Sequence, residues 1–159
     1  MTEPSPTARA DYFAVKPDLV GQLRSITRAM EQFTVARGLR ALVETRISQL
    51  NGCVYCTDLH SREARAAGER QPRLDHLPVW RESPLFTPRE KAALAWAECV
   101  TRADFGAAGD AAYARLRKHF SETELVELSL SASLTNFWNR MAAGFRKQPA
   151  PVAGEDRHP

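Results

Sequence analysis

Two segments of this chain carry the residue pattern that begins an α-helix and satisfies its free backbone N–H groups. Residues 87–90 read Thr-Pro-Arg-Glu and residues 121–124 read Ser-Glu-Thr-Glu. A hydroxyl residue three positions before a glutamate forms a capping box, and Pro88 suits the first helical position. We therefore predict one helix from Thr87 to about Arg102 and a longer one from Ser121 to about Phe145.

The remaining central chain places apolar residues at helical spacing and has almost no alternating, strand-like pattern. Further helices are predicted within residues 17–33, 38–50, 53–67 and 110–120. Asn51-Gly52 and Gly68 are typical helix ends. The proline-containing segment 69–86 is expected to be a packed connector with about one helical turn. The prediction is an all-α domain of about six to seven helices.

Composition limits the domain and its setting. The sequence of 159 residues suits one domain, placed at residues 17–147, with a loose N-terminal segment at 1–16 and a flexible tail at 148–159. The 22 basic and 19 acidic side chains are interspersed, which argues against nucleic-acid binding. No segment approaches the roughly 20 apolar residues of a membrane span. We expect a cytoplasmic protein without a membrane partner, whose thiols are kept reduced.

Two of the three cysteines lie close to a histidine. Cys53, Cys56 and His60 are separated by three and four residues, so on a helix they share one face. The N-terminal turn of a helix stabilises a thiolate, and two cysteines at this spacing can close a disulfide. His60 lies over the next turn, where it could take a proton from Cys56 or return one to a leaving group. This pattern indicates thiol redox chemistry.

Other interpretations of these residues are weaker. The cysteines could be small buried side chains, as we expect for Cys99. A zinc site would need a fourth ligand, and Cys99, His76 and His119 lack characteristic spacing, so no metal or cofactor is expected. A thioredoxin-like fold would need a strand before the motif. Two tryptophans, Trp96 and Trp138, are interpreted as core or interface anchors rather than substrate platforms.

Residues 46–56 read Arg-Ile-Ser-Gln-Leu-Asn-Gly-Cys-Val-Tyr-Cys and are followed by His60. This run resembles the signature of the carboxymuconolactone decarboxylase and alkyl hydroperoxidase D superfamily. A looser resemblance extends to residues 87–95 and 136–140, so that it covers about residues 17–147. It implies an all-α fold that assembles into dimers, trimers or hexamers.

The resemblance also implies roles for individual residues. In the thiol-dependent branch, the second cysteine attacks the peroxide, the first forms the disulfide, and the histidine relays protons; these positions are Cys56, Cys53 and His60. That branch also has a glutamate where this chain has Ala41, and Glu44, one turn later, is the candidate replacement or else a solvated helix charge. A histidine of the branch is replaced by Tyr55, which either donates a hydrogen bond at the site or packs at a subunit contact.

These expectations combine into a thiol-dependent peroxidase, an antioxidant homo-oligomer that reduces a hydroperoxide and is recycled by a dithiol or protein reductant. The sequence lacks a Gly-x-Gly-x-x-Gly fingerprint, so nicotinamide reducing power would arrive through a partner. One alternative is a decarboxylase-like enzyme acting on a small organic acid with His60 as base. Another is a non-enzymatic oligomer that senses redox state or binds a ligand.

Overall fold

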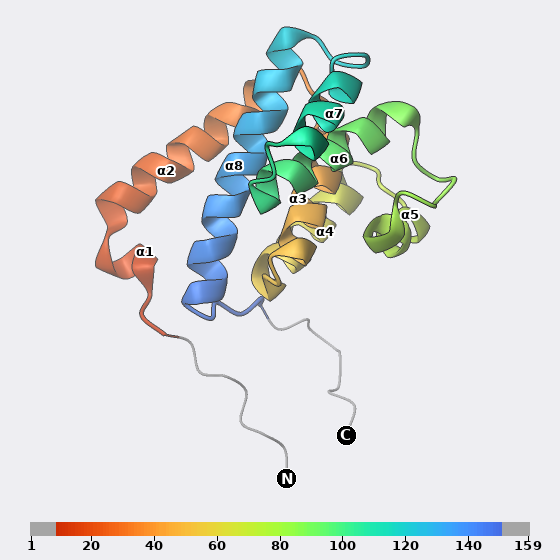
Figure 1. Ribbon diagram of the computed structural model, residues 1–159. Coiled ribbons are helices and arrows are strands. Elements are labelled where there is room, and N and C mark those ends of the chain that lie inside the picture. The colour runs from red at the N-terminus through yellow and green to blue at the C-terminus, as the bar shows by residue number, and fades with distance from the viewer. Residues whose placement is uncertain (1–8, 151–159) are drawn as a thin grey trace.

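The computed structural model describes residues 9–150, and every regular element within that range is helical, as the sequence predicts. Eight α-helices and two short 3₁₀ helices follow one another along the chain (Figure 1). Their bounds are α1 (Tyr12–Val15), α2 (Pro17–Ala29), η1 (Met30–Gln32), α3 (Arg37–Leu50), α4 (Val54–Ala66), α5 (Gln71–His76), η2 (Leu77–Val79), α6 (Pro88–Arg102), α7 (Ala107–Leu116) and α8 (Glu122–Gly144).

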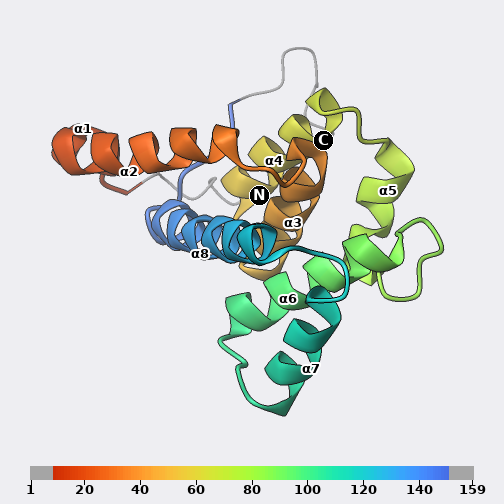
Figure 2. The ribbon, with the colours of Figure 1, turned by 90° about the horizontal axis from the view of Figure 1, so that it is seen from above.

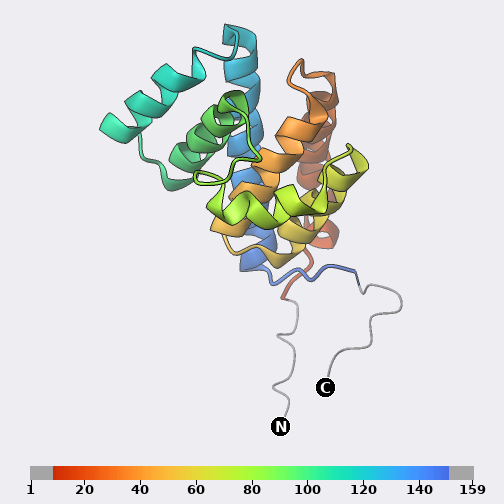
Figure 3. The same ribbon diagram turned by 90° about the vertical axis from the view of Figure 1, so that its right-hand side faces the viewer.

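Helix α3 is the centre of the bundle. It packs against α4, α6 and α8, and all nine of its residues from 40 to 48 are buried. Leu42 and Ile47 of α3 meet Leu94 of α6 and Leu128 of α8 in one apolar core. Figures 2 and 3 show α6 and α7 on the side of α8 opposite to α2. Burial on all sides makes α3 a rigid support for any polar side chain that it carries.

The predicted helix boundaries at the capping boxes and glycines are confirmed. Thr87 and Ser121 each accept a hydrogen bond from the backbone N–H three residues later, and the carboxylate of the glutamate at that position accepts one from the backbone N–H of Thr87 or Ser121. Gly52 and Gly68 have φ values of +63° and +92°, a conformation that favours glycine. These residues therefore determine where α6 and α8 begin and where α3 and α4 end.

Three local features differ from the sequence prediction. The N-terminal segment, expected to be loose, contains α1. The Asp11 carboxylate caps this helix, and the buried Tyr12 ring has its centroid 5.4 Å from that of Phe145. The connector forms α5 and η2 rather than one turn. Helix α7 begins at Ala107, earlier than predicted, and it includes Gly109, which the sequence suggested would precede the helix. A Cβ at position 109 would lie 2.5 Å from the Asp104 carbonyl oxygen. This glycine permits close packing instead of ending a helix.

A buried carboxylate ties α3 to α6 and the connector. Glu98 is 1% exposed and accepts hydrogen bonds from Arg46 (2.8 Å), Trp80 (3.0 Å) and Arg81 (2.6 Å). Burial alone would raise its pKa, but these donors lower the pKa of Glu98 to about 2. The group is therefore ionised throughout the physiological range and holds three segments together.

Helix α2 is the least buried long helix of the described part. Val20 is its one buried residue, while Leu19 and Ile26 are 58% and 55% exposed. Figure 2 shows α1 and α2 lying beside α8 at the edge of the bundle, and Trp138 of α8 donates a hydrogen bond to the Thr27 hydroxyl at 3.1 Å. Among the described residues, no helix has the length and hydropathy needed to cross a lipid bilayer.

Candidate functional site

The turn between α3 and α4 positions the two cysteines. Asn51 donates hydrogen bonds to the side-chain oxygens of Asn136 and Asn139 on α8, both at 2.9 Å. Cys53 then serves as the N-cap of α4, and its backbone N–H donates to the Ser48 carbonyl at 3.0 Å. The cysteine pair is therefore held to α3 and α8 by polar contacts on both sides of the turn.

Cys53 and Cys56 form a disulfide, with their Cα atoms 5.3 Å apart. Both are nearly inaccessible, at 2% and 3% exposure, and they pack against Ala142 and Tyr55. The backbone N–H of Cys56 donates to Cys53 Sγ at 3.2 Å. Cys56 lines a cavity and Cys53 does not, so a small molecule in that cavity meets Cys56.

His60 lies among two carboxylates. Its Nδ1 is 2.7 Å from Glu63 Oε2 and 3.4 Å from Glu44 Oε2. Glu44 is 5% exposed, and its other oxygen accepts a hydrogen bond from Ser131 at 2.9 Å. Nδ1 is thereby engaged, and Nε2 is the ring nitrogen left for proton exchange.

Glu44 thus reaches the histidine from one helical turn beyond Ala41, which lies in the core with no exposed surface. Of the two interpretations of Glu44, the solvated helix charge is wrong. Glu63 was missed in the sequence, although residues three apart on a helix are neighbours and Glu63 follows His60 by three. Arg37 was also missed, because nothing in the sequence brings it to this site.

Arg37 joins the two carboxylates. Its guanidinium is 2.8 Å from Glu44 and 2.6 Å from Glu63. Burial alone would raise the pKa of Glu63, but the hydrogen bond with His60 and the charge of Arg37 lower it. Burial likewise opposes the charge of Arg37, while the two glutamates raise its pKa. The site therefore places two carboxylates and a guanidinium next to the imidazole.

The same cluster is the one group of potential metal ligands that the described residues bring together. Ligand atoms of Glu44, His60 and Glu63 lie within 4.8 Å of one another. The Arg37 guanidinium already forms ion pairs with both carboxylates. The zinc candidates from the sequence do not join such a group: Cys99 Sγ contacts the Ala108 carbonyl, and His76 contacts the Ser83 hydroxyl.

The outer cavity, which Cys56 and His60 line, has a volume of about 730 Å³. Its wall combines aromatic and basic side chains from both ends of the described chain. Lys147 Nζ lies 4.0 Å from the ring centroid of Phe13 and 4.3 Å from that of Tyr55, which are distances for cation–π contacts. Tyr55, expected at the site or at a subunit contact, is therefore part of this wall.

A second, inner cavity of about 160 Å³ adjoins the first. The two cavities share five lining residues, which include His60, Glu63 and Trp138. Trp138, which the sequence suggests is a core or interface anchor, is half-buried and forms part of both cavity walls. Helix periodicity places a tryptophan on a face of α8 but does not reveal that α2 leaves this face partly open.

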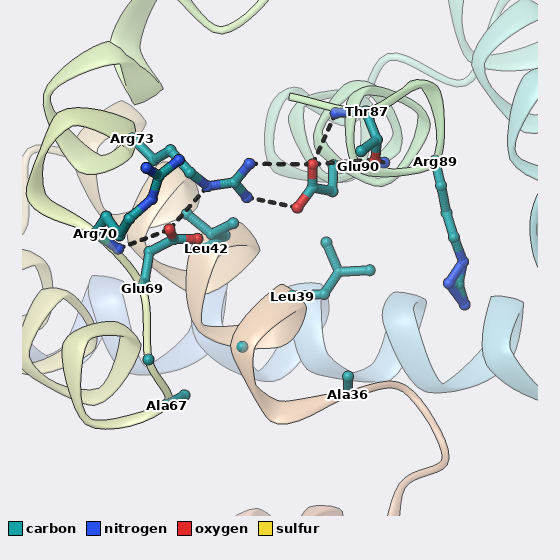
Figure 4. Close-up of a pocket in the computed structure, with 12 residues that line it drawn as sticks. Ala36, Leu39, Leu42, Ala67, Glu69, Arg70, Arg73, Thr87, Arg89 and Glu90 are labelled. Carbon is teal, nitrogen blue, oxygen red and sulfur yellow. Dashed lines mark hydrogen bonds and ion pairs between the residues drawn. The ribbon is translucent and has the colours of Figure 1, made fainter. Parts of the chain in front are cut away.

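A third cavity, of about 570 Å³, lies between α3, the end of α4, α5 and the start of α6. Figure 4 shows Arg73 between Glu69 and Glu90, with Leu39 and Leu42 on the wall below. Arg73 is paired with both acidic side chains of the lining, at 2.8 Å from Glu69 and 2.5 Å from Glu90. The lining contains neither cysteine nor histidine, so it offers no thiol chemistry.

The all-helical bundle, the Cys-x-x-Cys pair and the nearby histidine together define a class of helical thiol protein. Comparison with known sequences identifies the family to which this chain belongs. The sequence profile of the carboxymuconolactone decarboxylase family matches residues 26–98. The chain is 32% identical to YdfG, an uncharacterized protein of Bacillus subtilis strain 168, over 142 residues. The aligned residues make up 89% of this chain and 97% of YdfG. The chain belongs to this family.

Solved structures agree with this assignment. A protein of unknown function from Agrobacterium tumefaciens, for which the antioxidant defence protein AhpD has been suggested, is 32% identical with a TM-score of 0.87. That comparison covers 92% of this chain and 100% of the other. An uncharacterized peroxidase-related protein of Ralstonia eutropha JMP134 shares the fold at 22% identity and a TM-score of 0.77, over 87% and 74% of the two chains.

Proposed function

We propose that this protein is a thiol-dependent peroxidase that reduces an organic hydroperoxide at Cys56. The observation that carries the proposal is that Cys56 and His60 line one cavity while Cys53 is bonded behind Cys56. The relative from Agrobacterium tumefaciens, with its suggested antioxidant role, supports the same chemistry. Contact with the cavity favours Cys56 over Cys53 as the cysteine that attacks the peroxide.

The reaction begins with the reduced protein. The Cys56 thiolate attacks the terminal peroxide oxygen, the O–O bond breaks, and the alcohol leaves after receiving a proton from His60. Cys56 is then a sulfenic acid. Cys53 attacks its sulfur, water leaves, and the disulfide forms. A dithiol or protein reductant supplies two electrons and two protons to regenerate both thiols.

Glu44 and Glu63 orient His60 through its Nδ1 atom. With Nδ1 held within 3.4 Å of a carboxylate, Nε2 is the ring nitrogen that donates a proton to the departing alkoxide. In this mechanism Glu44 orients the histidine, a role that a glutamate at the position of Ala41 has in the related thiol peroxidases. Removal of a general acid lowers rates by about 10²–10⁴-fold.

The N-cap position gives Cys53 a matching role. The backbone N–H of Cys56 donates to its sulfur, and the helix N-terminus favours negative charge there. Cys53 is therefore a good leaving thiolate when the reductant attacks the disulfide. We also propose that the protein works as a homo-oligomer, because α8 exposes Val126, Leu130 and Phe137. We place it in a reducing cytoplasm, where the Cys-x-x-Cys pair can be returned to thiols.

Single-turnover kinetics test the proposal. Reduced protein is mixed with one equivalent of tert-butyl hydroperoxide, and peroxide and free thiols are followed together. Wild type should lose its peroxide together with two thiols and retain the third, Cys99, while Cys56→Ser should leave the peroxide unreacted. Cys99→Ser is the matched control and should react like wild type. Equal peroxide loss in wild type and Cys56→Ser would refute the proposal.

A further inference from the structure

Arg40 is a buried cation without a counter-ion. Its side chain is 4% exposed, and its Nε has no hydrogen-bond partner. The guanidinium makes no ion pair within 4.0 Å and no hydrogen bond to any described residue, and its Cζ lies 5.4 Å from the centroid of the Phe33 ring. Burial lowers the pKa of Arg40 because nearby carboxylates offset the loss of water only in part.

The neighbouring buried arginine shows how unusual this is. Arg46, two turns further along α3, is 9% exposed and lies 2.8 Å from Glu98. Buried arginines in proteins are nearly always paired, because an uncompensated charge inside a protein is strongly unfavourable. Because no described carboxylate lies within hydrogen-bond distance of Arg40, its guanidinium is free to bind an anion from outside the chain.

The free guanidinium lines the inner cavity beside the proposed reaction site. The cavity wall includes Arg40, His60, Leu134 and Trp138. Its volume of about 160 Å³ resembles that of an engineered cavity of about 150 Å³ that holds benzene. His60 and Trp138 also line the outer cavity with Cys56, so the two cavities meet at these residues.

Charge around the two cavities favours an anionic ligand. Arg37 is bound to Glu44 and Glu63, so these three groups carry a net charge of −1, which the four other basic side chains of the two linings outweigh. The outer cavity adds Arg24, Arg28 and Lys147. The one further carboxylate in either lining is Glu31, which makes no hydrogen bond or ion pair within the described chain.

We propose that the substrate is an organic hydroperoxide that also carries a carboxylate, and that Arg40 binds this carboxylate in the inner cavity. The apolar body of the substrate then lies along Trp138, and its peroxide group points into the outer cavity at Cys56. A planar guanidinium can hold a carboxylate through two parallel hydrogen bonds. This substrate assignment rests on the proposed peroxidase function, whereas the anion site itself does not.

Two cumene hydroperoxides provide a direct kinetic test. They are cumene hydroperoxide and its 4-carboxy derivative, which differ only in the carboxylate. Wild type should have a kcat/KM at least tenfold higher for the carboxylated compound, and Arg40→Met should lower this ratio at least tenfold. Arg62→Met is the matched control, since Arg62 pairs with Asp58 outside both cavities; it should keep the wild-type ratio.

A binding measurement separates the anion site from the chemistry. Calorimetry with the unreactive product, 4-(2-hydroxypropan-2-yl)benzoate, should give a Kd for the oxidised wild type that rises at least tenfold in Arg40→Met. The uncharged alcohol should bind both proteins equally. Tight, Arg40-dependent binding without peroxide turnover would refute the peroxidase function and uphold the site. A carboxylated ligand that binds no better than the neutral one, or equally well to Arg40→Met, would overturn the inference.

Discussion

Replacement of Glu98 by glutamine should reduce the stability of the fold in a way that depends on pH. The folded protein lowers the pKa of this carboxyl from 4.5 to about 2. Each tenfold change in proton affinity corresponds to about 1.36 kcal/mol, so the ionised group contributes about 3 kcal/mol at pH 7. Glutamine keeps the shape of the side chain but cannot be charged.

The sign of the pH effect follows from proton linkage. Because the folded pKa is lowered, the contribution is fully present above pH 4.5 and is lost as the pH falls towards 2. At pH 3 about 1.4 kcal/mol of it remains. Other carboxylates are common to both proteins, so their titration cancels in the difference between wild type and Glu98→Gln.

Urea unfolding at pH 7 and at pH 3, followed by circular dichroism, measures this difference. The free energy of unfolding should separate the two proteins by about 2 kcal/mol more at pH 7 than at pH 3. Any loss from imperfect hydrogen bonding of the glutamine is the same at both pH values and does not affect the comparison. An equal separation at both pH values would refute the account of the Glu98 cluster.

Three further substitutions have predictable effects on stability. Gly109→Ala should lower the free energy of unfolding by about 1–3 kcal/mol, because the new Cβ would lie 2.5 Å from the Asp104 carbonyl oxygen; a melting temperature equal to wild type would contradict this. Gly21→Ala should instead stabilise by about 0.5–1 kcal/mol, since nothing lies within 4 Å of that position in α2, and a lower melting temperature would argue against it. Glu127→Ala should cost about 2–3 kcal/mol in urea unfolding, because its carboxylate accepts hydrogen bonds from Thr34 and the Val35 N–H; an unchanged midpoint would count against that contact.

Much of the fold could be predicted from local sequence signals. The capping boxes at Thr87 and Ser121 and the glycines at 52 and 68 act within one turn of backbone, so their effect needs no knowledge of the tertiary structure. Helix α1 could not be predicted in this way. Its four residues are held by contacts between Tyr12 and Phe145, which are far apart in the sequence.

The site follows the same division. Cys53, Cys56 and His60 could be placed together from helical spacing alone, and Glu44 could be nominated because it lies one turn after Ala41. The placement of Arg37 and Arg40 beside them depends on how α3 packs against α4 and α8. Helical periodicity marks Arg40 as a polar residue on a helix, but burial without a partner is a property of the assembled bundle.

Chemical trapping on the Cys53→Ser variant tests the central assignment most directly. Without the resolving cysteine, a sulfenic acid on Cys56 cannot become the intramolecular disulfide. The reduced variant is treated with one equivalent of tert-butyl hydroperoxide in the presence of dimedone, and peptides are analysed by mass spectrometry. Peroxidase chemistry at Cys56 predicts a dimedone adduct on that residue, formed as the peroxide is consumed. An unmodified Cys56 after the peroxide has gone, or an adduct confined to Cys99, would contradict it.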